Sequence, residues 1–136
     1  MTFPHEIFKA YDIRGIVDRT LTNELVEQIG RALGTEAQQQ GVDTVVIGRD
    51  GRLSGPVLSK ELAKGFLATG CNVIDIGQVP TPTLYFATKE YKTGTGVQVT
   101  GSHNPPDYNG LKMMINGTTL SGELIQNIKQ RVLEKN

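Results

Sequence analysis

The sequence predicts a three-layer α/β/α domain built on a mixed, mostly parallel sheet of about four strands. Two observations predict this class: the apolar pattern switches repeatedly between helical spacing and short unbroken runs, and the two kinds of segment alternate. Such alternation is typical of a largely parallel sheet with helices on both faces. The 136 residues match the commonest size of one domain, so we expect a single domain over residues 1–136.

Two amphipathic helices are predicted in the first half of the chain. The first runs from Thr22, a good N-cap, to Gln40, and Gly41 is well suited to end it. The second begins at Ser54-Gly55-Pro56 and ends at Gly70. Their predicted inward faces are Leu25, Ile29, Leu33 and Ala37 in the first helix and Leu58, Leu62 and Phe66 in the second.

Strands are predicted where short apolar runs lack helical spacing. Residues 44–48 and 73–77 are apolar enough to be buried strands, and residues 96–100 and 111–115 form a third and a fourth. The last two lie too close in the chain for a helical crossover, so we expect them to pair antiparallel. The segment from Phe8 to Val17 is a candidate for an additional early strand.

Two further helices complete the predicted fold. One spans Thr81–Tyr91, and Pro80 and Pro82 bracket its start. The other follows the strong turn signal Asn116-Gly117 and is capped by Ser121. The predicted inward residues of this last helix are Leu124, Ile128 and Val132.

Composition and charge argue against several classes of protein. The 14 basic and 14 acidic residues balance, whereas nucleic-acid-binding domains usually carry a basic excess. No apolar stretch approaches the roughly 20 residues of a membrane span, and the N-terminus lacks the pattern of a secretory signal. Cys71 is the only cysteine and is interpreted as a small core residue. We therefore predict a cytoplasmic location and no nucleic-acid or membrane partner.

Polar side chains gather where three of the predicted strands end. Gly48-Arg49-Asp50-Gly51-Arg52 follows one strand, residues 77–82 follow the next, and Thr100-Gly101-Ser102-His103-Asn104 follows the third. Ligands of open α/β sheets bind beyond the carboxyl ends of the parallel strands. The sequence thus predicts a binding or catalytic site at that edge.

Ser102 is the candidate reactive group. Gly101 permits close approach to the backbone, and Pro105-Pro106 stiffens the exit from the loop. Composition alone still favours an ordinary turn serine. A hydrolase nucleophile is disfavoured, because Ser102 lacks the G-x-S-x-G pattern and only His5 and His103 are available as partners.

The charged residues also have two interpretations. In the first, Asp50-Gly51 is a tight turn, and Arg49 and Arg52 are solvated or paired with Asp50. In the second, a guanidinium uses its fork of donors to bind phosphate or to orient the loop. Lys112 is compatible with a surface lysine. Tyr11 and Arg14 are compatible with packing and a surface charge.

Several motifs together resemble one family, the α-D-phosphohexomutases of the phosphomannomutase/phosphoglucomutase superfamily. The loop Thr100–Pro105 resembles the family's phosphoserine loop, and Phe8–Gly15 resembles its opening motif. Residues 48–54 and 79–82 resemble its G-R-D-x-R and P-T-P segments, and Asp107–Lys112 also matches. Gly101 stands where many members carry alanine, and we expect this difference to leave the serine unaffected.

The resemblance implies domain 1, the phosphoserine domain, of a four-domain enzyme, with domains 2–4 absent from this sequence. It implies that Ser102 moves phosphate between C1 and C6 of mannose or glucose phosphate through a bisphosphate. By the same resemblance Arg14 binds the phosphoryl group and Tyr11 lines the substrate cleft. His103 and Asn104 position the serine, and Asn104 also contacts substrate. Lys112 becomes the general base, which requires that neighbouring cations favour its neutral form.

The resemblance also implies a cofactor and partners. Mg²⁺ is expected to bind a phosphate oxygen on Ser102, with its other ligands in the second domain. Arg49, Asp50 and Arg52 are expected to support the loop. The expected partners are the hexose phosphate and the remaining domains. Two alternatives stay open: a non-catalytic phosphoprotein or phosphosugar-binding module of this fold, and a general interaction domain.

Overall fold

The computed structural model describes residues 2–135, which form four α-helices, a 3₁₀-helix and a six-stranded sheet. In chain order the elements are η1 (His5–Ile7), β1 (Ile13–Ile16), α1 (Asn23–Gln39), β2 (Thr44–Arg49), α2 (Gly55–Ala68), β3 (Asn72–Gln78), α3 (Thr81–Glu90), β4 (Gly96–Val99), β5 (Tyr108–Ile115), β6 (Thr118–Thr119) and α4 (Gly122–Glu134).

The sheet is mixed, as predicted. Its strand order is β1-β5-β4-β2-β3, and β6 pairs with the end of β5. Strand β2 is parallel to β3 and β4, whereas β5 is antiparallel to both β4 and β1. The antiparallel pairing of β4 with β5 is therefore confirmed. The sheet has more strands than the predicted four, because β1 extends it beyond β5 and the turn at Asn116-Gly117 folds back into β6.

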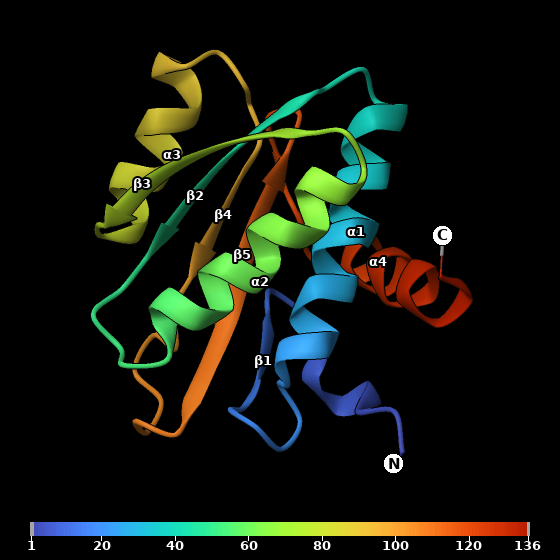
Figure 1. Cartoon of the computed structure of the whole chain (residues 1–136), viewed down its shortest axis with the longest axis vertical. Helices are drawn as coiled ribbons and strands as arrows, with labels where there is room; N and C mark the ends of the chain where they lie inside the picture. Colours follow the sequence, from blue (N-terminus) through green and yellow to red (C-terminus); the bar gives the residue numbers. More distant parts are fainter. Residues whose placement is uncertain (1, 136) are drawn as a thin grey trace.

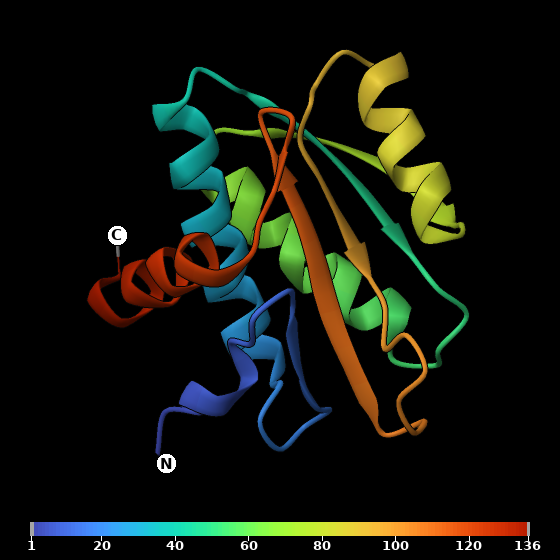
Figure 2. The same ribbon diagram turned by 180° about the vertical axis from the view of Figure 1, so that it is seen from behind.

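Helices cover both faces of this sheet, which confirms the three-layer prediction. Helix α2 lies over one face in Figure 1, and α3 lies over the opposite face, nearest the viewer in Figure 2. Because successive strand residues point to opposite faces, Val45 and Ile47 join the main core with α1, α2 and α4. Val46 joins a smaller core beneath Leu84 and Ala87 of α3.

The first two helices form as the sequence predicts. Thr22 occupies the N-cap of α1, where its Oγ1 accepts a hydrogen bond from the Leu25 amide at 3.2 Å. Pro56 lies in the first turn of α2, where its missing N–H costs no helical hydrogen bond. All of the predicted inward residues of α1 and α2 are buried.

Two predictions about burial are wrong. Strand β3 was expected to be buried, but it is the edge strand of the sheet and none of its residues is fully buried. In α4, Leu124 is 42% exposed and Ile125 is buried in its place. The inward stripe of this helix is Ile125, Ile128 and Val132, which is also compatible with helical spacing. Ser121 does precede α4, but its side chain makes no capping hydrogen bond.

The lone cysteine lies in the main core, as predicted. Cys71 is buried, and its Sγ lies 3.7 Å from the carbonyl oxygen of Gly34. Among residues 2–135, none of the helices combines the length and apolar character that crossing a membrane requires.

Candidate functional site

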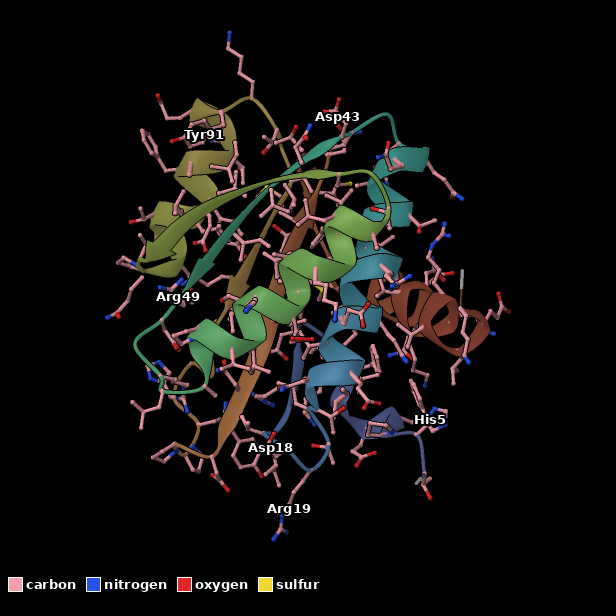
Figure 3. All side chains as sticks on the ribbon, viewed as in Figure 1. His5, Asp18, Arg19, Asp43, Arg49 and Tyr91 are labelled. Atoms are coloured by element: carbon pink, nitrogen blue, oxygen red, sulfur yellow. The ribbon has the colours of Figure 1, made fainter. Side chains whose placement is uncertain are left out.

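The segments that carry the predicted site lie at one edge of the sheet. Strands β1 to β4 all run toward this edge, because β2, β3 and β4 are mutually parallel and β5 reverses between β4 and β1. Figure 3 shows Arg49 near the end of β2 and Asp18 and Arg19 in the turn after β1, whereas Asp43 and Tyr91 lie at the opposite edge. We call these two sides the serine edge and the far edge.

Ser102 lies on the outside of a compact turn at the serine edge. Its side chain is exposed, and its hydroxyl makes no hydrogen bond to the described residues. Its backbone is left-handed, with φ of 54°, a region that residues other than glycine rarely adopt. The Asn104 backbone N–H and side-chain Nδ2 both donate to the Gly101 carbonyl oxygen, at 3.0 and 2.8 Å. The turn therefore presents the serine hydroxyl to solvent.

Asp50 joins the end of β2 to the start of this turn. Its Oδ2 accepts hydrogen bonds from the Thr100 hydroxyl at 2.8 Å and the Gly101 amide at 3.1 Å. Its Oδ1 accepts from the Arg52 amide at 3.1 Å, and the Arg52 Nε lies 3.4 Å from Oδ2. One carboxylate thus fixes both the loop after β2 and the loop after β4.

Arg52 holds the rest of the serine loop through backbone carbonyl groups. Its guanidinium nitrogens donate to four carbonyl oxygens at distances from 2.6 to 3.1 Å, those of Ser102, Asn104, Pro105 and Tyr108. A guanidinium has five donors in a rigid planar fork, and Asp50 lies beside the remaining one, Nε. One side chain from the neighbouring loop thus holds the backbone at four positions between residues 102 and 108.

Arg49, the third residue expected to support the loop, faces another element. Its Nη1 lies 3.6 Å from Oδ1 of Asp75 on β3, because alternate residues of a strand point in different directions. The same Asp75 oxygen accepts a hydrogen bond from the Gly77 amide at 2.8 Å. The ion pair of Arg49 is therefore with β3, and no hydrogen bond or ion pair joins its side chain to the serine loop among residues 2–135.

The structure adds a packing constraint at position 101, where glycine instead of alanine is expected to leave the serine unaffected. A Cβ on Gly101 would overlap the Cζ and Nε atoms of Arg52. Arg52 is held in place by its carbonyl partners, so alanine here requires that this side chain shift. The close approach of the guanidinium to the backbone depends on the missing side chain at this position.

Arg14 and Lys112 lie on the same face of the sheet, the one covered by α3. Arg14 is opposite Gly110, and Lys112 is opposite Gln98. Gln98 is in turn paired with Gly48 of β2. Gly48 lies two residues from Val46, which packs under α3, so both point to the face that α3 covers. Both cations are half-buried, and neither makes an ion pair within residues 2–135. Two cations without acidic partners favour binding of an anion on this face.

The remaining predicted residues differ in exposure. Tyr11 is 77% exposed, and His103 is exposed on the outside of the serine loop. Asn104 is half-buried and is used inside the turn, as described above. Their proposed roles toward a substrate remain predictions.

The contacts of three polar residues at the site were not predicted from the sequence. Thr100 links Asp50 to Ser102, since its Oγ1 also accepts a hydrogen bond from the Ser102 amide at 3.0 Å. Asn109 is fully buried and donates to the Ser54 hydroxyl at 2.8 Å. Gln98, with 0% exposure, donates to the Val79 carbonyl oxygen at 2.7 Å. Gln98 lies between two valines in a central strand, and a polar residue in such an apolar run could have indicated a buried hydrogen bond.

The described residues do not form a metal site by themselves. Within residues 2–135 no three His, Cys, Asp or Glu side chains gather in a way that could hold a metal ion. Any metal bound at the serine edge would need ligands from elsewhere or from a phosphoryl group.

The fold and the site together define a class: an α/β/α domain with an exposed serine in a loop that Asp50 and Arg52 hold at the serine edge of its sheet. The family model described as "Phosphoglucomutase/phosphomannomutase, alpha/beta/alpha domain I" matches residues 5–136. The chain therefore belongs to the phosphoglucomutase/phosphomannomutase family, as the resemblance of its motifs predicted.

Individual relatives agree with this assignment. The chain is 53% identical over 135 residues to "Phosphomannomutase/phosphoglucomutase" of Pseudomonas aeruginosa, covering 99% of this chain and 29% of that protein. It is 53% identical over 130 residues to "Phosphoglucomutase" of Neisseria meningitidis, covering 96% and 28%. The crystal structure of a phosphoglucomutase/phosphomannomutase family protein from Burkholderia thailandensis has a TM-score of 0.91 at 45% identity, covering 99% and 31%. The chain thus spans less than a third of each of these relatives.

Proposed function

We propose that this chain carries the reactive serine of a phosphosugar mutase that moves phosphate between C1 and C6 of a hexose phosphate. Mannose and glucose phosphates are the proposed substrates, because the relatives are named phosphomannomutase and phosphoglucomutase. The observation that carries the proposal is the exposed Ser102 hydroxyl, presented by a loop that Asp50 and Arg52 hold in place.

In the proposed reaction, phosphorylated Ser102 is the resting state. A free hydroxyl of the sugar phosphate attacks the phosphorus, the bond from phosphorus to Ser102 Oγ breaks, and a sugar bisphosphate forms. The bisphosphate turns around in the site. Ser102 Oγ then attacks its other phosphorus, which releases the isomeric sugar phosphate and restores the phosphoserine.

The charges at the site suit this chemistry. A phosphoserine carries about −1.5 to −2 charges at neutral pH, and phosphoryl transfer depends mainly on alignment and electrostatic stabilisation. Arg14 is proposed to contact the phosphoryl group. Lys112 is proposed to take the proton of the attacking hydroxyl and pass it to the departing Ser102 Oγ, and to move it from Oγ to the departing sugar oxygen in the second half of the cycle. The absence of acidic partners for these two cations among the described residues supports both roles.

Magnesium belongs to the proposal with a single ligand from this chain, a phosphate oxygen on Ser102. A bound Mg²⁺ would neutralise charge that develops on the transferred group. Its other ligands are proposed to come from further domains of the same enzyme, as is the choice between sugars. We also propose that the chain works in the cytoplasm alongside those domains.

A chimeric enzyme tests this function. Residues 1–136 would replace the matching region of the Pseudomonas aeruginosa relative, and interconversion of mannose 1-phosphate and mannose 6-phosphate would be measured. We expect turnover, phosphate on Ser102 by intact mass and peptide mapping, and loss of both in Ser102→Ala. Binding of sugar phosphate without turnover would instead support a non-catalytic module, and full turnover by Ser102→Ala would refute the proposed nucleophile.

A further inference from the structure

The left-handed conformation of Ser102 needs a physical cause. With φ of 54° it is one of five such residues other than glycine in residues 2–135, and a serine has no intrinsic preference for this region. The conformation matters, because it turns the side chain outward from a loop whose neighbours Thr100 and Gly101 are buried. Whatever holds φ of Ser102 therefore also sets where its hydroxyl lies.

Two side chains hold the peptide groups on either side of Ser102. The Thr100 Oγ1 accepts a hydrogen bond from the Ser102 N–H at 3.0 Å, and Arg52 Nη2 donates to the Ser102 carbonyl oxygen at 3.1 Å. The angle φ describes rotation about the bond from N to Cα. Fixing the amide plane before that bond and the carbonyl after it restricts this rotation.

The Thr100 hydroxyl is itself oriented. A hydroxyl has one proton to donate and lone pairs with which to accept. The Thr100 proton goes to Asp50 Oδ2 at 2.8 Å, so a lone pair is available to the Ser102 amide. The Thr100 side chain is buried, with 6% exposure, so water competes little for either hydrogen bond.

We propose that Thr100 is a positioning residue: its hydroxyl, oriented by Asp50, keeps Ser102 in the left-handed conformation that presents Oγ for phosphoryl transfer. The conformational part stands on the geometry alone. The consequence for turnover rests on the proposed function of Ser102.

The far edge supplies a matched control. Thr95 is also buried, and its Oγ1 accepts a hydrogen bond at 3.0 Å from the amide of Asn116, whose φ is 50°. Thr95→Val removes the same kind of bond at the other end of the same strand. Any loss that follows from weakening this strand in general should appear in both variants.

The first experiment examines the conformation in solution. A residue with positive φ gives a strong intraresidue NOE between its amide and α protons, and hydrogen exchange reports protection of the amide. In Thr100→Val we expect this NOE at Ser102 to weaken and exchange of its amide to become roughly two- to tenfold faster. Thr100→Ser keeps the hydroxyl and should behave as the wild type, as should Thr95→Val. Should Thr100→Val fail to fold, Thr100→Ala, which only removes atoms, replaces it.

The second experiment uses the chimeric enzyme. Misplacing a reacting group by about 1 Å costs up to roughly 100-fold in rate, so Thr100→Val should lower kcat about 10- to 100-fold and leave KM within about twofold. Thr100→Ser should restore kcat, and Thr95→Val should not lower it. Equal losses of kcat in Thr100→Val and Thr95→Val would point to general destabilisation and overturn the positioning role.

The two arms separate failure of this inference from failure of the proposed function. An unchanged NOE and unchanged amide exchange in Thr100→Val overturn the inference, whatever the kinetics show. A chimera without turnover would count against the proposed function, and the NOE comparison would still decide whether Thr100 holds Ser102.

Discussion

Both ends of β4 place a threonine beside a left-handed residue, yet the two ends differ in what supports that residue. At the far edge the turn contains Asn116 and Gly117, with φ of 50° and 83°. Asparagine and glycine adopt this region more readily than other residues. The Gly117 amide donates to the Gly94 carbonyl oxygen at 2.7 Å, and the Asn116 amide donates to the Thr95 hydroxyl. Backbone hydrogen bonds and this one hydroxyl are enough to hold the turn.

At the serine edge the left-handed residue is Ser102, and serine does not favour this region. Ser102 is held by a carboxylate, a guanidinium and a hydroxyl that come from two different loops. The comparison teaches that an exposed residue without a preference for this conformation is held by a network of side chains. The turn of Asn116 and Gly117, two residues that adopt this conformation readily, has no such network among the described residues.

The largest expected effect is on turnover, and it compares Lys112 with a lysine near the far edge. If Lys112 is the general base, Lys112→Met in the chimeric enzyme should lower turnover by about 10²- to 10⁴-fold and leave Ser102 able to accept phosphate. Lys89→Met is the control, because Lys89 is exposed in the last turn of α3 near the far edge. Turnover and intact mass measure the two outcomes. Turnover that survives Lys112→Met would eliminate the role of base.

The next effect compares two arginines. Arg52→Ala leaves four carbonyl groups of the serine loop without their donor, and we expect the free energy of unfolding to fall by about 2 kcal/mol. Arg131→Ala removes a partly buried ion pair between helices and should cost about 0.5 kcal/mol. Urea denaturation of this chain measures both. Similar losses of stability in the two variants would contradict the conclusion that Arg52 holds the serine loop.

A smaller effect is expected at Gly101. Gly101→Ala adds a Cβ where the Arg52 guanidinium lies, and crowding of this kind costs about 1 kcal/mol. The double variant Gly101→Ala/Arg52→Ala tests the cause, because residues in direct contact show non-additive effects. If alanine destabilises by displacing Arg52, its cost should largely vanish once Arg52 is absent. An additive cost would mean that Gly101 matters for another reason.

The comparison also explains how far the sequence could be interpreted. Periodicity and caps were enough for α1 and α2, because burial of an apolar stripe is a local property of the pattern. The short connection was enough for the antiparallel pairing of β4 with β5. The position of β3 was missed, since an apolar run does not reveal whether a strand is central or at the edge. Leu124 was assigned to the wrong side of α4, because the neighbouring Ile125 gives a stripe of equal quality.

At the site, motifs indicated the segments but not the contacts between them. Arg49 and Arg52 lie three positions apart in one motif, and only the fold shows that the first faces β3 and the second the serine loop. Thr100 looked like the last residue of a strand. Its role depends on Asp50, fifty positions earlier, and such a relation appears only when β2 and β4 are placed side by side.

The smallest expected effect concerns an ion pair near the far edge. There a carboxylate, Glu36, joins two helices, whereas the Asp50 carboxylate at the serine edge joins two loops. Glu36 of α1 accepts hydrogen bonds from Gln40 at 2.8 Å and from Arg131 of α4 at 2.9 and 3.1 Å. The bond from Gln40 lowers the pKa of Glu36 from its usual value of 4.5; burial opposes this, and Arg131 lowers the pKa further.

A lowered pKa means that the unfolded chain binds the proton more tightly than the folded one. The stabilisation by Glu36 is therefore complete above its unfolded pKa and disappears as the pH falls through the lower, folded pKa. We expect Glu36→Gln to be about 0.5 kcal/mol less stable near neutral pH and equal to the wild type in acid. Urea denaturation across pH measures this, with exposed Glu90→Gln as control. A deficit that persists unchanged in acid would show that the carboxylate charge is not what joins α1 to α4.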